Sequence, residues 1–190
     1  MAEAIRTRFE PPKISNAKDF LEKTPQHLEV GKLKKPPSMK FLKWLPTARG
    51  EISLVLQKSE WYIIKASVMG VPSALPPLSS DVILHSHPLD KEDKHGEGMV
   101  PGIRDFVNCS PTAKNLIVSS FGITQYWSVK DEIKWKDLRT ELLLSFPRFN
   151  SKKNFPAYLE FLKNNDARYE SHPWMRIDES KFKELLSPKV

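Results

Sequence analysis

The sequence predicts an α/β protein in which a small central β-sheet is flanked by helices. Residues 51–57 (EISLVLQ) and 60–68 (EWYIIKASV) are rich in β-branched and aromatic residues, with only Lys58 and Ser59 between them. This pattern is typical of an antiparallel hairpin. The short apolar run DVILH at 81–85 predicts a buried strand. Strands interspersed with helical segments favour a sheet with helices packed on it.

The other elements are predicted from periodicity and from residues typical of helix ends. A short helix is expected within 15–30 and another within 101–108, where a proline precedes the first turn. Two more strands are expected on either side of Phe121 and Gly122. Three helices are expected further on, the first with apolar residues at helical spacing. These strands and helices span residues 115–120, 122–129, 131–146, 155–165 and 178–186.

Composition and charge limit the class of protein. Of the 190 residues, 39% are hydrophobic, which is typical of a globular chain. No apolar run approaches the roughly 20 residues of a membrane span, and the first residues lack the apolar core of a signal peptide. Cys109 is the single cysteine, so no intrachain disulfide is possible, as in a reducing compartment. We therefore expect a cytoplasmic protein that does not enter a membrane.

The positive charge is concentrated at the N-terminus. The chain carries a net charge of +7, and residues 1–49 hold 11 lysines and arginines against five acidic residues. A basic segment can attract an acidic partner or nucleic acid, although it can also be a solvated tail. The segment KFLKWL at 40–45 adds aromatic residues, but Phe41 and Trp44 also suit a hydrophobic core.

The chemical signal lies at His85 and His87. Residues i and i+2 of a strand point to the same face, so the two imidazoles can converge on one metal ion. Pro88 ends the strand, and Asp105 lies in the first turn of the helix predicted after the next loop. Zinc binds histidine nitrogens and carboxylate oxygens, so Asp105 is the candidate third ligand. A surface or hydrogen-bonded histidine pair is the alternative, because one His-x-His pair is a weak motif.

The surrounding sequence resembles the JAMM (MPN+) family of zinc isopeptidases, which includes deubiquitinating enzymes. HSHP at 85–88 matches the family's His-Ser/Thr-His-Pro, and PGIRDF at 101–106 is similar to its Pro-Ser-x-x-Asp segment. AKNLIVSSFGITQYW at 113–127 looks like the family's strand, Gly turn and strand. RGEISLVL at 49–56 places a glutamate at the start of an early strand, as the family does. The similarity covers residues 45 to 130.

This resemblance implies a fold and a mechanism. The fold would be a central mixed β-sheet of the cytidine-deaminase type, with a JAMM-like metalloprotease domain at 41–145. One zinc ion would be held by His85, His87 and Asp105, with water as its fourth ligand. Glu51 would serve as the general base on that water, and Glu60 at the next strand start is the competing candidate. The flanks would be a basic N-terminal segment at 1–40 and a helical C-terminal extension at 146–190.

Two departures from the family pattern bear on activity. Seventeen residues separate His87 from Asp105, against about ten in the family, and the excess forms the charged loop 89–100. We expect that loop to gate substrate at the rim, with its His95 solvated rather than bound to metal. Gly102 stands where the family has a serine that stabilises the oxyanion. Loss of one such donor costs about 10²–10³ in rate in well-studied hydrolases.

The expected function is therefore zinc-dependent hydrolysis of isopeptide or peptide bonds. The substrate would be a protein tail, including tails of the ubiquitin-like class. Two alternatives remain open: a catalytically weak JAMM-like module that binds or scaffolds, and a nucleic-acid-associated protein that uses the basic N-terminal segment.

Overall fold

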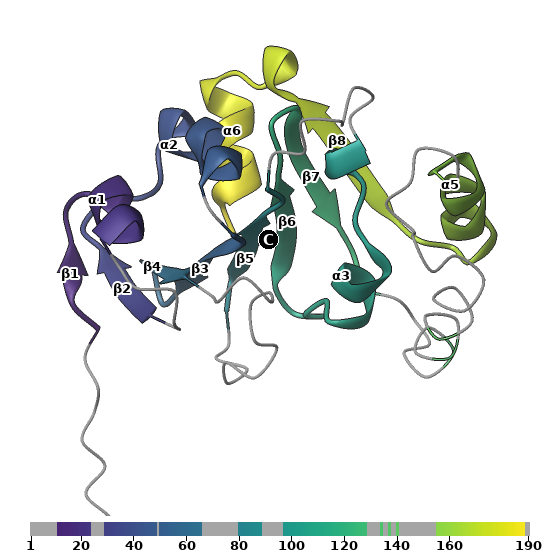
Figure 1. The fold of residues 1–190 in the computed structure, drawn as a ribbon, viewed down its shortest axis with the longest axis horizontal. Coiled ribbons are helices and arrows are strands. Elements are labelled where there is room, and N and C mark those ends of the chain that lie inside the picture. Colours follow the sequence, from purple (N-terminus) through teal and green to yellow (C-terminus); the bar gives the residue numbers. More distant parts are fainter. Residues whose placement is uncertain are drawn as a thin grey trace, which may run out of the picture.

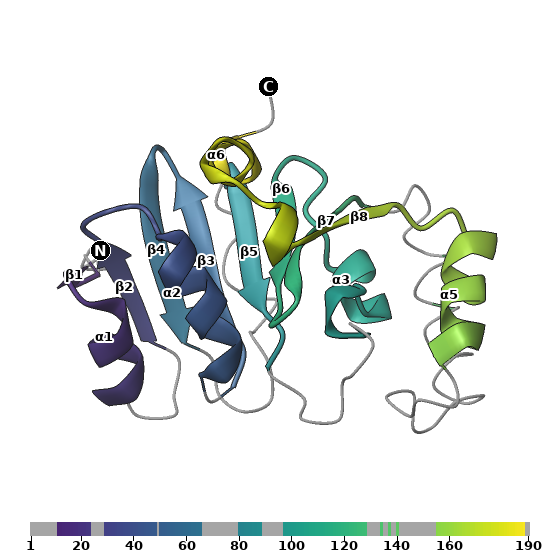
Figure 2. The same ribbon diagram turned by 90° about the horizontal axis from the view of Figure 1, so that it is seen from above.

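A computed structural model describes most of the chain, namely residues 11–23, 29–48, 50–65, 80–88, 97–128 and 155–188 with positions 134, 137 and 140. Within these residues eight strands form one mixed sheet in the order β1-β2-β4-β3-β5-β6-β7-β8. The bounds of the strands are β1 Lys13–Ile14, β2 Glu29–Leu33, β3 Ile52–Gln57, β4 Glu60–Lys65, β5 Val82–Ser86, β6 Lys114–Val118, β7 Gly122–Tyr126 and β8 Tyr169–Pro173. The predicted α/β class is confirmed. Figure 2 shows the strands in this order across the sheet, from β1 at one edge to β8 at the other.

Five α-helices accompany this sheet in the described ranges. They are α1 Ala17–Lys23, α2 Met39–Trp44, α3 Ile103–Val107, α5 Phe155–Asn164 and α6 Glu179–Leu186. Three 3₁₀ turns link them to the strands: η1 Leu45–Thr47, η2 Glu97–Met99 and η3 Trp174–Arg176. The helix predicted at 131–146 lies largely outside the described residues.

The central hairpin forms as its sequence predicts. β3 and β4 pair antiparallel from Ile52–Lys65 to Gln57–Glu60. The two residues between them, Lys58 and Ser59, both have positive φ, 49° and 65°. Two-residue hairpin turns need such left-handed conformations because they match the right-handed twist of the strands.

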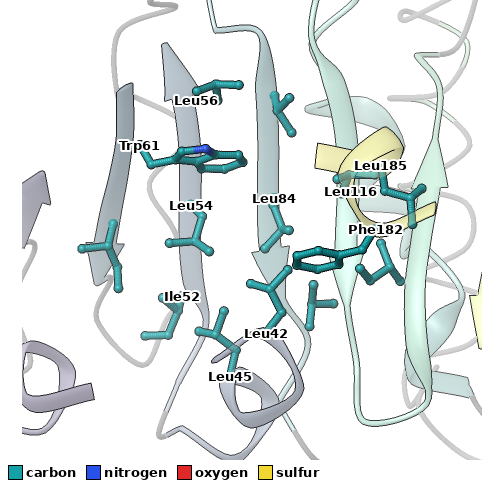
Figure 3. Close-up of a cluster of buried hydrophobic side chains, with 14 of the residues drawn as sticks. Leu42, Leu45, Ile52, Leu54, Leu56, Trp61, Leu84, Leu116, Phe182 and Leu185 are labelled. Carbon is teal, nitrogen blue, oxygen red and sulfur yellow. The ribbon is translucent and has the colours of Figure 1, made fainter. Parts of the chain in front are cut away.

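One face of the sheet carries the larger hydrophobic core. There α1, α2, η1 and α6 pack on β3, β4, β5 and β6 (Figure 1). Phe182 of α6 lies beside Leu42 and Leu84 (Figure 3). The aromatic residues of KFLKWL belong here: Phe41 and Trp44 are partly buried and pack against this core.

The opposite face carries a smaller core formed by α3 and α5. Ile103 and Phe106 of α3, with Tyr158 and Leu162 of α5, pack on Ile117 and Tyr126 of the sheet. His85 of β5 lies on this second face, as its ring contact with Tyr126 shows. The candidate metal ligands therefore lie on the face with the smaller core.

Both ends of the described chain contribute strands that the sequence pattern did not predict. β2 pairs with β4, and β1 pairs with β2, so residues before 40 extend the sheet. β8 pairs with β7 from Gly122–Pro173 to Tyr126–Tyr169, so the segment after 146 is not only helical. The sheet thus runs across the boundaries expected at residues 40 and 145.

Candidate metal centre

Three side chains converge where β5 ends and α3 begins. His85 Nε2 lies 3.3 Å from His87 Nε2 and 3.2 Å from Asp105 Oδ1, and His87 Nε2 lies 3.4 Å from Asp105 Oδ2. Each residue thus offers one ligand atom, and these atoms lie within 4.8 Å of one another. The side chains are 14–20% exposed, so the cluster is largely enclosed but can still be reached from solvent. These three residues could hold a metal ion.

The strand β5 places the two histidines on one face and Ser86 on the other. Ser86 is fully buried, and its hydroxyl accepts a hydrogen bond of 3.0 Å from the backbone N–H of Ile52. His87 follows β5 directly, and its own N–H donates to the carbonyl of Val118 at 2.8 Å. The end of β5 is therefore fixed to β3 on one side and to β6 on the other.

A backbone carbonyl fixes the ring of His87. Its Nδ1 lies 3.0 Å from the carbonyl oxygen of Gly98 in η2. Because a carbonyl can only accept, Nδ1 carries the proton, and Nε2 is left to face the cluster. Burial alone would lower the pKa of His87, but the hydrogen bond and negative charge of Asp105 outweigh it. The Gly98 carbonyl and the charge of Glu51 act in the same direction, so the pKa lies above its usual value.

Asp105 is held by the first turn of α3. Its Oδ2 accepts the backbone N–H of Gly102, the residue that caps this helix, at 2.6 Å. The carboxylate is thereby oriented with Oδ1 toward His85. Burial would raise the pKa of Asp105, but the nearby His85 and His87 hold it well below its usual range. Asp105 is therefore an ionised carboxylate, the form that binds a metal.

Aromatic packing surrounds His85 and the start of α3. The Tyr126 ring meets the rings of His85 and Phe106 edge-on, with centroids 6.2 and 5.9 Å apart. Burial, together with the charge of Asp105, raises the pKa of Tyr126, so its phenol stays protonated. The Tyr158 hydroxyl donates to the Pro101 carbonyl at 2.7 Å, which connects α5 to the approach to α3.

Glu51 lies beside this cluster, whereas Glu60 does not. The β3–β5 ladder ends at Ser53 and His85; Glu51 directly precedes β3 and His87 directly follows β5, so both lie at the same end of this antiparallel pair. The charge of Glu51 contributes to the raised pKa of His87, which agrees with that position. Glu60 lies at the far end of the hairpin, opposite Gln57, where it forms an ion pair with Lys32 and accepts a hydrogen bond from Tyr62. Of the two candidates for the base, only Glu51 is close to the three ligands.

Gly102 occupies an ordinary backbone conformation. Its φ is −71° and its ψ 163°, which any residue can adopt. It has no hydroxyl to offer, and two serines close in sequence to the ligands are engaged. Ser86 accepts the Ile52 N–H on the opposite face, and Ser110 Oγ accepts the N–H of Ala113.

Some predicted features cannot be placed, and some supporting groups had no sequence signal. Residues 89–96, which include His95 and most of the expected rim loop, lie outside the described residues. The contact of the Gly98 carbonyl with His87 could not be predicted, because every residue has a carbonyl and only the fold brings this one to the ring. Tyr126 could be predicted to lie on a strand, but its contact with His85 depends on the order of strands in the sheet.

The chain matches no family model, and no curated protein or solved structure is significantly similar to it. None of the helices in the described ranges combines the length and the apolar character needed to cross a membrane.

Proposed function

We propose that this chain is a zinc-dependent hydrolase of the JAMM type that cleaves isopeptide or peptide bonds. The observation that carries the proposal is the spacing of the ligand atoms. Zinc bonds of about 2.0–2.1 Å in tetrahedral geometry place neighbouring ligand atoms about 3.3–3.4 Å apart. His85 Nε2 lies 3.3 Å from His87 Nε2 and 3.2 Å from Asp105 Oδ1, which is close to this spacing. The 3.4 Å contact of His87 Nε2 is with the second carboxylate oxygen, Oδ2. Two imidazoles and one carboxylate are also a donor set that catalytic zinc sites use.

The charge balance of the cluster supports a dication. Asp105 is ionised, and His87 presents an unprotonated Nε2 when its Nδ1–H donates to Gly98. Without a cation, the two Nε2 atoms face each other at 3.3 Å, where a shared proton or a metal is needed to make the contact favourable. A zinc ion bound there would lower the pKa of water to about 7 and polarise a carbonyl group.

The proton carrier in this proposal is Glu51. Glu51 directly precedes β3 at the end of the sheet where His87 follows β5, and its charge acts on His87. It would take a proton from the attacking water and give it to the leaving amine, which yields a carboxylate and an amine. The hydrogen bond from Ile52 to Ser86 supports this role, because it holds the residue after Glu51 to the end of β5.

The substrate class follows from the resemblance rather than from the cluster. We propose a protein tail joined through an isopeptide bond, of the ubiquitin-like kind, as the first class to test. The second candidate function is a zinc-binding module with weak catalysis, and the specific observation that favours it is the missing hydroxyl at Gly102. The nucleic-acid alternative would use the ring of Trp44 to stack on a base. That ring is already covered by Lys18, whose Nζ lies 4.6 Å from the ring centroid, so the structure does not favour this alternative.

Metal analysis and hydrolysis test the proposal together. Purified wild type should contain one zinc per chain, and His87→Ala should lose it, because the ligand atom is removed. Glu51→Gln should keep zinc and lose hydrolysis of Gly-Gly isopeptide-linked substrates, because an amide cannot accept the proton. Glu60→Gln is the matched control, since it changes the same chemistry at the far end of the hairpin, and it should stay active.

Two results would contradict the proposal. Full zinc occupancy in His87→Ala would exclude this ligand set. Loss of activity in Glu60→Gln with an active Glu51→Gln would show that the base is not Glu51. If the zinc-loaded wild type hydrolyses none of the isopeptide or peptide substrates, the binding-module function is supported instead.

A further inference from the structure

A buried hydroxyl lies beside one of the three ligands. Ser53 of β3 is the register partner of His85 on β5. Residues directly opposite each other in an antiparallel pair point to the same face, with Cβ atoms about 4.5–5.5 Å apart. Ser53 is 4% exposed, and in the described part of the chain its hydroxyl has no hydrogen-bond partner. A buried polar group without a partner calls for an explanation, because nearly all such groups are hydrogen-bonded.

The second ring nitrogen of His85, Nδ1, also lacks a hydrogen-bond partner among the described residues. The Nε2 of His85 faces His87 and Asp105. A metal bound there takes the lone pair of Nε2, so the proton of the neutral ring is then on Nδ1. Within the described ranges no acceptor lies within hydrogen-bond distance of that Nδ1. His87 differs, because its Nδ1 is satisfied by the Gly98 carbonyl. Metal-binding histidines almost always donate their second N–H to an acceptor, which fixes the ring and raises its basicity.

The order of the strands places Ser53 on the side of the His85 ring that faces away from Tyr126. β5 lies between β3 and β6, and the Tyr126 ring of β7 meets His85 from the β6 side. Ser53 therefore lies on the opposite flank of His85. A serine side chain is short, so its oxygen stays near the level of Nδ1, close to the sheet. It does not reach the level of Nε2, where the metal would bind.

We infer that Ser53 is a positioning residue whose Oγ accepts the Nδ1–H of His85 when the metal is bound. The inference rests on the proposed metal site and deepens it by assigning the outer partner of the first ligand. Ser53 thereby orients the ring of His85 in the way that the Gly98 carbonyl orients the ring of His87. Removing the hydroxyl should leave the ring free to turn and should weaken the hold on the metal.

Zinc affinity is the primary measurement. Zinc is titrated into the apo protein in competition with a chromogenic chelator, for wild type, Ser53→Ala and Ser53→Thr. We expect Ser53→Ala to bind zinc about 10–100-fold more weakly, as other outer partners do. Ser53→Thr keeps the hydroxyl and should restore affinity to near the wild-type value.

The matched control removes another buried hydroxyl from the same row of the sheet. Thr124 on β7 is fully buried, and its hydroxyl contacts Ser171 at 2.9 Å. It is two strands away from His85, through Ile117. Thr124→Val should lower the melting temperature without changing zinc affinity. A general effect of losing a buried hydroxyl would instead weaken zinc binding in both variants.

A second readout does not depend on a variant. In the zinc-loaded wild type, long-range ¹H–¹⁵N spectra should show the His85 proton on Nδ1, protected from exchange with solvent. That protection should be lost in Ser53→Ala. The signal is specific to this hydrogen bond, so it tests the inference even if Ser53→Ala does not fold.

The outcomes separate this inference from the proposed function. If wild type binds no zinc, both are overturned. If wild type binds zinc and folded Ser53→Ala binds it equally well, only the role of Ser53 is overturned. A rapidly exchanging or absent His85 Nδ1 proton in the zinc-loaded wild type also overturns the role of Ser53 alone.

Discussion

Restoring a hydroxyl at position 102 tests whether this residue limits the chemistry. The structure allows the change Gly102→Ser without strain, because φ is −71° and ψ 163°. A Cβ atom added there would meet Asp105 Oδ2 at 3.4 Å, which is an ordinary van der Waals contact. Asp105 already accepts the N–H of residue 102. A serine would supply the missing half of this capping box by accepting the N–H of Asp105.

The expected effect on stability is small and the effect on rate is large. At a helix N-cap, serine is better than glycine by only a few tenths of a kcal/mol. For a chain of this size, about 1 kcal/mol corresponds to 2–4 °C, so the melting temperature should rise by roughly 1 °C. The hydroxyl proton remains available to the oxygen on which charge develops. One such donor contributes about 10²–10³ to kcat, and KM should change little because the gain belongs to the transition state.

The assay compares zinc-loaded wild type, Gly102→Ser and Gly102→Ala on an isopeptide-linked substrate. Alanine adds the same Cβ without the hydroxyl, so it should leave kcat unchanged and slightly lower the melting temperature. The difference in kcat between serine and alanine therefore isolates the hydroxyl. If both folded variants show equal kcat with full zinc occupancy, position 102 does not limit the reaction and the reasoning is refuted.

Two further predictions concern the sheet that holds the site. A Cβ atom at Gly122 would lie 2.2 Å from the carbonyl oxygen of His172 in β8, so Gly122→Ala should lower the free energy of unfolding by about 1–3 kcal/mol in urea denaturation. A change below about 0.5 kcal/mol would show that β8 does not pack this closely on β7. The double change Lys58→Asn with Ser59→Gly should raise the free energy of unfolding by about 1 kcal/mol, because Asn-Gly favours the positive φ values of this exposed turn. Zinc content should stay at the wild-type level, and a drop in stability would contradict the turn geometry.

Local sequence pattern was sufficient to predict the central hairpin and the candidate ligands. The ligand pair depends on the two-residue period of a strand, which places His85 and His87 on one face wherever the strand lies. Asp105 could be predicted because a helix start is marked by residues close in sequence. The turn at Lys58 and Ser59 was predicted from its length alone. Each of these features depends on neighbours within a few positions.

The edge strands were not predictable in the same way. β8 has the sequence YESHP, with one aromatic residue and little alternation, and its side chains are half-buried or exposed. Its conformation depends on the backbone hydrogen bonds that β7 offers. The same holds for β1, which has two residues and pairs only with β2.

The supporting shell of the site was decided by tertiary structure alone. Ser53 and His85 are 32 positions apart, and His87 and the Gly98 carbonyl that it contacts are 11 positions apart. Tyr126 meets His85 because β6 and β7 follow β5 in the sheet. The sequence determined which residues could hold a metal ion, because that depends on side-chain type and on strand period. The strand register determined which neighbours orient them, because register depends on the packing of the whole sheet and not on any short segment.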